Sequence, residues 1–320
     1  MKLLSISIAL VLALVAVRPS SAEEPATIEK AAAVLDLSKF PLPKGVEPPK
    51  LRRPAALSYE TSSGVTEAFA FVKKTLVDAG WAEAPGGYAS DQAASGVFEK
   101  EGYRVSVSAF EGSRPGTASV AILNHGNVEG KSLPVPDGSK LLYETPLGPA
   151  YLAPGTVAAV ADEVHKRLRE QEWEPYGSAG DVRFYKRNAV KLGARVTEAP
   201  AQGGQTMLGY STELMSADLP APEDAVRAQY ADSTKELSFD VPREPKEVFD
   251  LYREALGKKG WEPVTASPMK ERLGESLRFR NPARELMSLE VQTIDGLSRG
   301  RLRHQSAEEV EAMLASASKP

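Results

Sequence analysis

Few residues of this sequence have the type and spacing that catalysis or metal binding requires. The three histidines, His125, His165 and His304, lie far apart in the chain, and the residues four positions before and after His165 are Ala161 and Arg169. A zinc site on a helix needs a second ligand at that spacing. The chain has no cysteine, which excludes disulfides, thiolate metal ligands and a cysteine nucleophile. We therefore interpret the histidines as solvated side chains and expect no metal and no cofactor.

Carboxylates are the remaining candidates for catalysis. Asp91, Glu99, Glu101 and Asp240 are able in principle to form the acid and base pair of a hydrolase. The chain carries 43 acidic residues, so separate surface carboxylates are the simpler interpretation. The sequence has no nucleophile elbow, phosphate-binding loop, dinucleotide fingerprint or calcium loop. We therefore predict no catalytic residue.

The densest group of basic residues is the alternating series Arg299, Arg301 and Arg303. Alternate residues of a β-strand project from the same face, so three guanidinium groups at this spacing would lie side by side. Two interpretations are open. The series is either a solvated strand edge, where charge discourages edge-to-edge association, or the contact surface for an anionic partner such as a wall polymer or a lipid headgroup.

The elements that would position these residues follow from an internal repeat. Trp81, Trp173 and Trp261 are 92 and 88 residues apart, and the residues five, nine and thirteen positions before each tryptophan are apolar. Steps of four residues trace one face of a helix, so each tryptophan follows an amphipathic helix and is expected to be buried beside it. The three predicted helices span 65–79, 156–171 and 245–259. Phe69 and Phe249 widen the apolar stripe of the outer two helices, whereas Ala161 leaves the middle stripe thinner.

A second marker supports the repeat and sets its boundaries. A Pro-x-Pro motif begins at Pro41, Pro134 and Pro220, at a nearly constant distance before each tryptophan. The constant order of motif, short strand, helix and tryptophan predicts three tandem copies of one module of roughly 90 residues. The predicted units are 40–130, 133–215 and 219–303, with joints at 126–131 and 215–217, a lead segment at 23–39 and a tail with a C-terminal helix at 304–320.

Short alternating or apolar segments predict the strands. One strand precedes each helix, at 56–60, 150–153 and 236–241, and further strands follow each tryptophan. Alternation of polar and apolar residues indicates a sheet with one face in water. The fold class is therefore α+β, with one helix packed on a small antiparallel sheet in each of three repeats. The strands expected after the tryptophans are 96–100, 103–110, 117–123, 182–187, 189–198, 206–210, 276–281 and 286–294.

Some helix ends are predicted from capping residues. Thr66 and Thr156 are expected as N-caps and Pro245 at a first helical position. Gly80 and Gly260 suit left-handed C-terminal caps. The middle helix has Glu172 at the corresponding place, and because a glutamate resists positive φ, we expect that helix to end differently. In the tail, Ser306 to Glu309 form a capping box that opens a C-terminal helix.

The combined pattern of Pro-x-Pro, strand, helix and Gly-Trp, as in the segment from Ala255 to Pro263, resembles tandem modules of uncharacterised bacterial envelope proteins that carry signal peptides. The resemblance covers most of the chain after residue 22. It implies an exported α+β repeat protein, and it implies no activity and no catalytic residues.

The N-terminus has the composition of a secretory signal peptide over residues 1–22. Lys2 precedes an apolar run of 15 residues, and Ser20 and Ala22 fit a cleavage site. The run is shorter than the roughly 20 residues that a helix needs to cross a bilayer, so no transmembrane span is expected. Without a cysteine there is no residue to carry a lipid. The sequence therefore predicts a periplasmic or secreted protein that is not a lipoprotein.

Composition narrows the function without identifying it. The net charge is −4 for the chain and −6 without residues 1–22, which contain Lys2, Arg18 and no acid. A chain of this charge lacks the strongly basic face that general nucleic-acid binding needs. The leading hypothesis is a non-enzymatic binding module of the bacterial envelope, with an unknown macromolecule or ligand as partner. The alternatives are a periplasmic hydrolase with a carboxylate site between modules and a purely structural envelope component.

Overall fold

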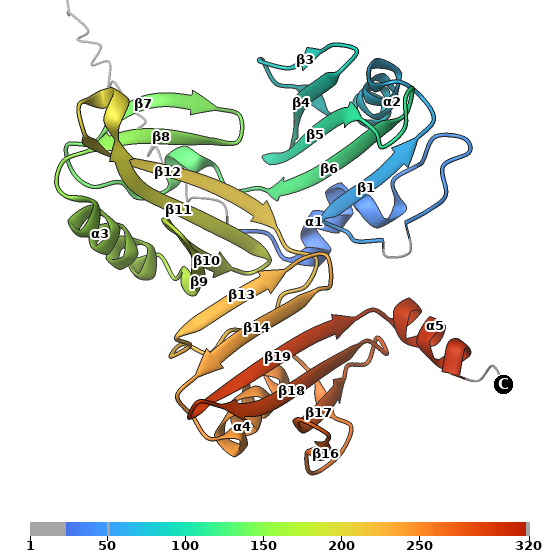
Figure 1. Cartoon of the computed structure of the whole chain (residues 1–320), viewed down its shortest axis with the longest axis vertical. Helices are drawn as coiled ribbons and strands as arrows, with labels where there is room; N and C mark the ends of the chain where they lie inside the picture. Colours follow the sequence, from blue (N-terminus) through green and yellow to red (C-terminus); the bar gives the residue numbers. More distant parts are fainter. Residues whose placement is uncertain (1–23, 50–51, 318–320) are drawn as a thin grey trace, which may run out of the picture.

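The computed structural model describes residues 24–49 and 52–317. In these residues the chain forms five α-helices and three antiparallel sheets (Figure 1), which confirms the α+β class. The predicted signal peptide lies outside the described residues. No helix within the described ranges is long and apolar enough to cross a membrane.

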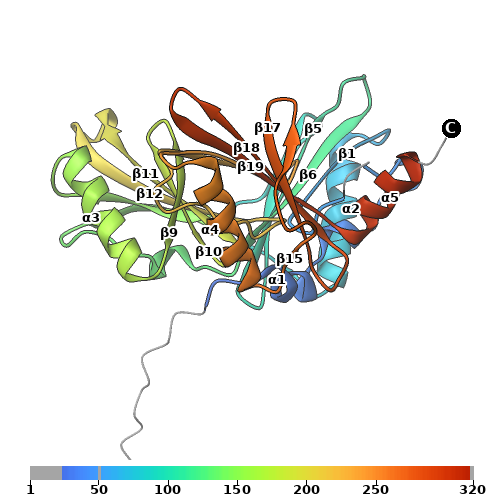
Figure 2. The same ribbon diagram turned by 90° about the horizontal axis from the view of Figure 1, so that it is seen from below.

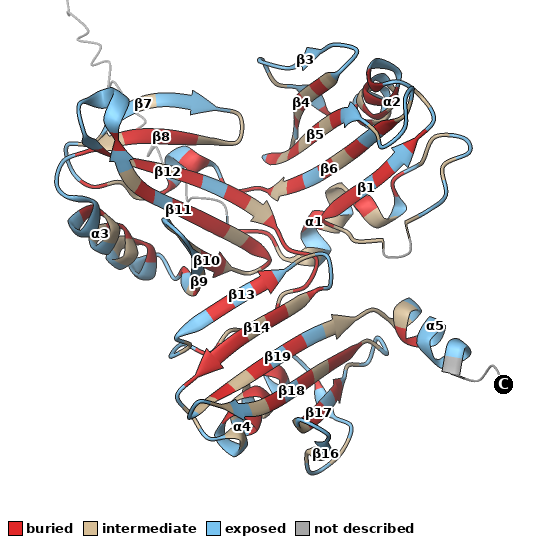
Figure 3. Cartoon of the chain, in the orientation of Figure 1, coloured by how far each residue is buried: buried red, intermediate tan, exposed pale blue. Residues whose placement is uncertain are grey.

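Helix α2 (Val65–Asp78) packs on one face of the first sheet, against β4, β5 and β6. Buried and partly exposed residues alternate along its two longest strands, so one face lies on the helix and the other faces outward (Figure 3). Its strand order is β1-β6-β5-β4-β2, with β3 also paired to β4. The strands are β1 (Ala56–Thr61), β2 (Ala82–Glu83), β3 (Tyr88–Ala89), β4 (Ala93–Lys100), β5 (Tyr103–Glu111) and β6 (Ala118–Gly126).

Helix α3 (Val157–Glu170) packs on the second sheet, against β9, β11 and β12. Its strand order is β7-β8-β12-β11-β10-β9. The strands are β7 (Lys140–Thr145), β8 (Gly148–Ala153), β9 (Glu174–Ala179), β10 (Val182–Arg187), β11 (Val190–Ala199) and β12 (Gln205–Leu214).

Helix α4 (Pro245–Gly257) packs on the third sheet, against β15 and β18. Its strand order is β13-β14-β19-β18-β17-β15, with β16 also paired to β17. Helix α5 (Ala307–Ala317) follows the last strand and extends away from the sheet (Figure 1). The strands are β13 (Arg227–Ala231), β14 (Glu236–Val241), β15 (Glu262–Pro263), β16 (Met269–Glu271), β17 (Gly274–Arg280), β18 (Leu286–Ile294) and β19 (Leu297–Gln305).

The three sheets have the same strand order once the edge strands β7 and β13 and the short additional strands β3 and β16 are set aside. In each sheet the strand before the helix pairs with the last strand, and the remaining strands follow in reverse chain order. Figure 2 shows α3, α4 and α2 spread across the width of the molecule, each beside its own sheet. The first two sheets share one continuous cluster of buried residues, whereas the third sheet has a cluster that includes Tyr176 of β9.

The three helices end in the same way, which corrects the expectation for the middle helix. Each tryptophan donates its backbone N–H to the carbonyl of the leucine five residues earlier, at 3.0, 3.0 and 3.1 Å. This bond needs a left-handed residue between helix and tryptophan, and Gly80, Glu172 and Gly260 have φ of 85°, 63° and 79°. The closing bond therefore imposes positive φ even on a glutamate. All three tryptophans are buried.

The starts of the helices agree with the sequence except in the first. The Thr156 side chain accepts a hydrogen bond from the Ala159 N–H, and Pro245 occupies the first turn of α4. Thr66 is not a cap, because α2 begins one residue earlier, after Gly64. Ser306 and Glu309 form the reciprocal bonds of the predicted capping box before α5. The lead segment contains a short helix, α1 (Ile28–Val34).

Candidate functional site

The predicted arginine series lies on the outward face of the third sheet. Arg299, Arg301 and Arg303 all belong to β19, alternating with the buried residues Gly300 and Leu302. Because alternate residues share a face, the three guanidinium groups project together away from α4. We call the surface formed by these residues and by Arg227, Arg278 and Ser288 the arginine face.

Cross-strand register places the other members of the arginine face. Arg303 of β19 stands opposite Ser288 of β18, and Ser288 in turn stands opposite Arg278 of β17. Two arginines thus flank one small hydroxyl residue in a row across three strands. Alternation along one strand does not show this row, because the register across the consecutive strands β17, β18 and β19 depends on how the strands pair. The only signal for them is the polar alternation along their own strands.

Acidic residues neutralise part of the arginine face. Arg299 donates its Nε–H to Asp240 at 2.8 Å, and Arg227 donates its Nε–H to the same carboxylate at 2.7 Å. The hydrogen bond from Arg299, with that from Arg227, lowers the pKa of Asp240 below its ordinary value despite partial burial. Arg301 pairs with Glu290 at 2.9 Å.

Two guanidinium groups of the arginine face are not neutralised in this way. Among the residues that the structure describes, Arg278 and Arg303 have no ion-pair partner, and both are exposed. Beside them the sheet is hollowed by a depression of about 600 Å³, whose lining includes Ser238, Arg278, Glu290, Arg299 and Arg301. The arginine face therefore combines free positive charge with a shallow concavity.

The candidate carboxylates are dispersed. Asp91 accepts a hydrogen bond from Thr66 of α2, and Asp240 is paired with Arg299 of the arginine face. Glu99 and Glu101 both line a cleft of about 1050 Å³ between the first sheet and the hairpin of β7 and β8. In the residues with described positions, no group of three histidine, aspartate or glutamate side chains is arranged to hold a metal ion.

The cleft is built around a partly buried arginine. Arg104 of β5 donates hydrogen bonds to the carbonyls of Val128 and Pro146, so it ties the segment after β6 to the hairpin. Burial lowers the pKa of Arg104, while the negative charges of Glu99 and Glu129 oppose that effect. The guanidinium group thus holds the cleft walls together.

The three histidines are not simply solvated, which corrects the sequence interpretation. His125 lies in β6, with Nδ1 2.7 Å from the Thr212 carbonyl of β12 and Nε2 2.8 Å from the Ser106 hydroxyl. His165 contacts the Tyr185 hydroxyl at 3.2 Å, and His304 packs edge-on against Trp261. Since a carbonyl only accepts, Nδ1 of His125 carries the proton and Nε2 accepts from Ser106. His125 therefore connects the first two sheets.

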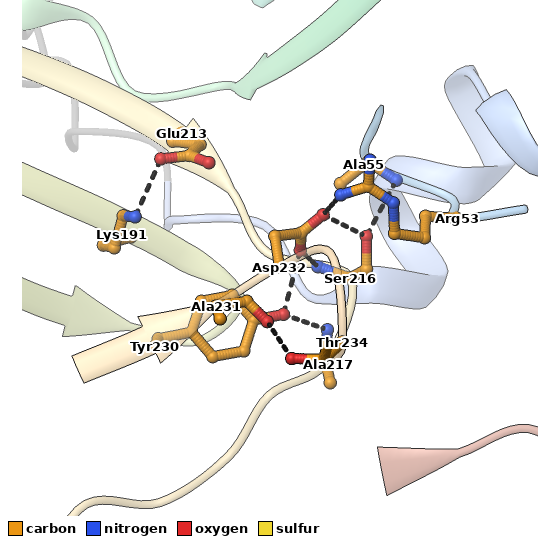
Figure 4. Close-up of polar contacts among 10 residues, drawn as sticks. All are labelled: Arg53, Ala55, Lys191, Glu213, Ser216, Ala217, Tyr230, Ala231, Asp232 and Thr234. Atoms are coloured by element: carbon orange, nitrogen blue, oxygen red, sulfur yellow. Dashed lines mark hydrogen bonds and ion pairs between the residues drawn. The ribbon is translucent and has the colours of Figure 1, made fainter. Parts of the chain in front are cut away.

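A second polar cluster connects all three sheets (Figure 4). Asp232, in the turn after β13, accepts hydrogen bonds from the Ser216 backbone at 2.7 Å and from the Tyr230 hydroxyl at 2.9 Å. It also pairs with Arg53, which precedes β1, at 2.5 Å. Burial, and then the carboxylate of Asp232, raise the pKa of Tyr230. Because every member is engaged with another part of the chain, this cluster is a structural joint.

Comparisons of this chain with protein-family models, with curated proteins and with solved structures find no match. Function therefore has to be argued from the geometry of the chain itself.

Proposed function

We propose that this chain is an exported, non-enzymatic binding protein of the bacterial envelope, whose arginine face contacts an extended anionic polymer. The observation that carries this proposal is the row of Arg278, Ser288 and Arg303, whose two guanidinium groups are exposed and have no ion-pair partner in the described part of the chain. The chain as a whole is acidic, with a net charge of −4, so this concentration of positive charge is local. Exposed guanidinium groups bind carboxylates and phosphates through paired N–H donors.

The spacing of the arginines favours an extended partner. Alternate residues of one strand are roughly 7 Å apart, and residues two strands apart are separated by roughly 10 Å. Arg301 and Arg303 have the first separation, and Arg278 and Arg303 have the second. A polymer with regularly repeated anionic groups can bridge such distances, whereas one small anion reaches only one of these pairs.

The three units are proposed to be copies of one module. The shared strand order, the shared bond that closes each helix and the similar spacing of the tryptophans, 92 and 88 residues, support this proposal. Repetition multiplies sheet faces and joints rather than building one catalytic centre, which suits a binding protein. The proposed location in the periplasm or outside the cell rests on the composition of residues 1–22.

The experiment replaces Arg299, Arg301 and Arg303 with serine and measures retention on anionic lipid vesicles and on peptidoglycan at low and high salt. Wild type should be retained at low salt and released as salt rises, because exposed charges are screened beyond a Debye length of about 8 Å at physiological ionic strength. The triple variant should lose most of that retention. The matched control replaces three exposed arginines outside the face, Arg114, Arg169 and Arg195, which changes the net charge equally.

Each result decides between the hypotheses. Equal retention of wild type and triple variant, or equal loss in the control, means that the arginine face is not the contact surface. No retention of wild type on either matrix at low salt favours the purely structural envelope component. The comparison of vesicles with peptidoglycan separates a lipid surface from a wall polymer.

The cleft supports a second candidate, a hydrolase with its carboxylates between modules. Glu99, Glu101, Glu129 and Glu144 all line the space of about 1050 Å³ between the first two units. One of them, Glu144, is paired with Lys131 at 2.8 Å. Degradation of peptidoglycan by wild type that is lost in Glu99→Gln or Glu101→Gln would favour this candidate over the binding protein.

A further inference from the structure

The middle unit lacks an aromatic side chain that both other units have. Twelve residues before Trp81 and Trp261 stand Phe69 and Phe249, and twelve before Trp173 stands Ala161. Phe69 and Phe249 are 5% and 1% exposed and belong to the cores beneath α2 and α4. Ala161 fills far less space at the same place on α3, so the middle helix leaves a gap against its sheet.

The gap is an apolar pocket of about 390 Å³. It is open at the surface, because Val157 at its entrance is 38% exposed. A volume of a few hundred Å³ with mostly apolar walls is typical of pockets that bind small ligands. The walls are Val157, Ala158 and Val164 of α3 with Tyr185, Ala194 and Val196 of the sheet.

The charged residues that line the pocket are Asp181, which is paired with Arg195 at 3.8 Å, and Arg183. In the first sheet the residue at this register position is Gly96, which lies against the ring of Phe69. In the second sheet it is Arg183, opposite Ala194, and its guanidinium group reaches the Ala161 carbonyl and the Asp162 carboxylate, both at 3.2 Å. The Asp162 side chain is 75% exposed, and an ion pair that open to water is easily exchanged.

We propose that this pocket binds a small aromatic carboxylate. The ring occupies the place that Phe69 and Phe249 fill in the other units, and the carboxylate replaces Asp162 as the partner of Arg183. The site lies in the second sheet, is separate from the arginine face and does not depend on the anionic polymer proposed there.

The test uses 3-phenylpropionate as the ligand and 3-phenylpropanol as its uncharged counterpart, with binding followed by calorimetry and by ligand-observed NMR. Wild type should bind the acid saturably, with a dissociation constant of roughly 0.1 to 1 mM for so small a ligand. Ala161→Phe should abolish binding, because its ring occupies the pocket from within. Ala159→Phe, on an exposed position of the same helix, should bind as wild type does.

Two further variants make the outcome decisive. Ala194→Leu fills the pocket from the sheet side and serves if Ala161→Phe does not fold. Arg183→Gln should weaken binding of the acid by about tenfold and leave binding of the alcohol unchanged. Absence of saturable binding to wild type, or binding that persists in both filled variants, would overturn the proposal. Equal affinity of wild type for acid and alcohol would overturn the assignment of a carboxylate ligand.

Discussion

Replacing Glu172 with glycine should stabilise the protein. Glu172 ends α3 with φ of 63°, in the place where α2 and α4 have Gly80 and Gly260. A left-handed backbone costs an L-residue about 1 to 2 kcal/mol, and a glycine avoids that cost. The strain persists in the native chain because the Trp173 N–H must reach the Leu168 carbonyl, 3.0 Å away.

Two smaller effects oppose the gain. A glycine makes the unfolded chain more flexible, which costs about 0.5 to 1 kcal/mol. The substitution also removes the ion pair between Glu172 and Arg187, 2.8 Å long. Because the Glu172 side chain is 79% exposed, that pair contributes at most a few tenths of a kcal/mol. The net expectation for Glu172→Gly is an increase of about 0.5 kcal/mol in the free energy of unfolding.

The measurement is urea unfolding followed by tryptophan fluorescence and circular dichroism. Glu172→Ala is the control, because it removes the same ion pair and keeps a β-carbon, so it should not stabilise. Gly260→Ala should destabilise by about 1 kcal/mol, since it introduces the strain that Glu172 already carries. An unchanged or lower midpoint for Glu172→Gly, or an equal rise for Glu172→Ala, would refute the reasoning.

Two more outcomes are expected. Trp81→Ala should cost about 3 to 5 kcal/mol in urea unfolding, because the side chain is buried beside α2 at 2% exposure; a loss below about 1 kcal/mol would contradict its place in the core. Burial lowers the pKa of His125 in the folded chain below its ordinary value. As pH falls below about 6.5, the unfolded chain therefore binds more protons than the folded chain, and the free energy of unfolding should decrease. His125→Gln, which keeps a neutral group facing Thr212, should reduce this pH dependence between about pH 7 and 5, and an identical slope in both proteins would show that another group is responsible.

Arg299, Arg301 and Arg303 lie on one strand, β19, but their spacing in the sequence does not indicate which residues surround them. Arg299, Arg301 and Arg303 share a face because a strand alternates, which is a local rule. The partners of Arg299 and Arg301, Asp240 and Glu290, lie on neighbouring strands, and alternation within one strand does not specify the register between strands. For the same reason the sequence did not reveal that Arg278 and Ser288 complete the row.

The segments that the sequence missed have weak local patterns. Strand β7 is mostly exposed, β9 contains Pro175 and Gly177, and β13 alternates but is only five residues long. Their strand geometry is stabilised by neighbours that are remote in the chain. The joint predicted at 215–217 is buried: the Ser216 N–H donates to Asp232 in the turn after β13, and the Ala217 N–H donates to the Tyr230 hydroxyl of β13.

The sequence by itself determined the elements that depend on neighbours within a few residues. Apolar residues at steps of four before each tryptophan predicted α2, α3 and α4, because a helix brings those residues onto one face. Tertiary structure alone decided how the units join and what each sheet face presents. His125 between two sheets and Asp232 among three depend on contacts between residues far apart in the chain, which no local pattern records. The thinner apolar stripe at Ala161 is visible in the sequence, but the sheet residues that form the opposite wall of the pocket are known only from the structure.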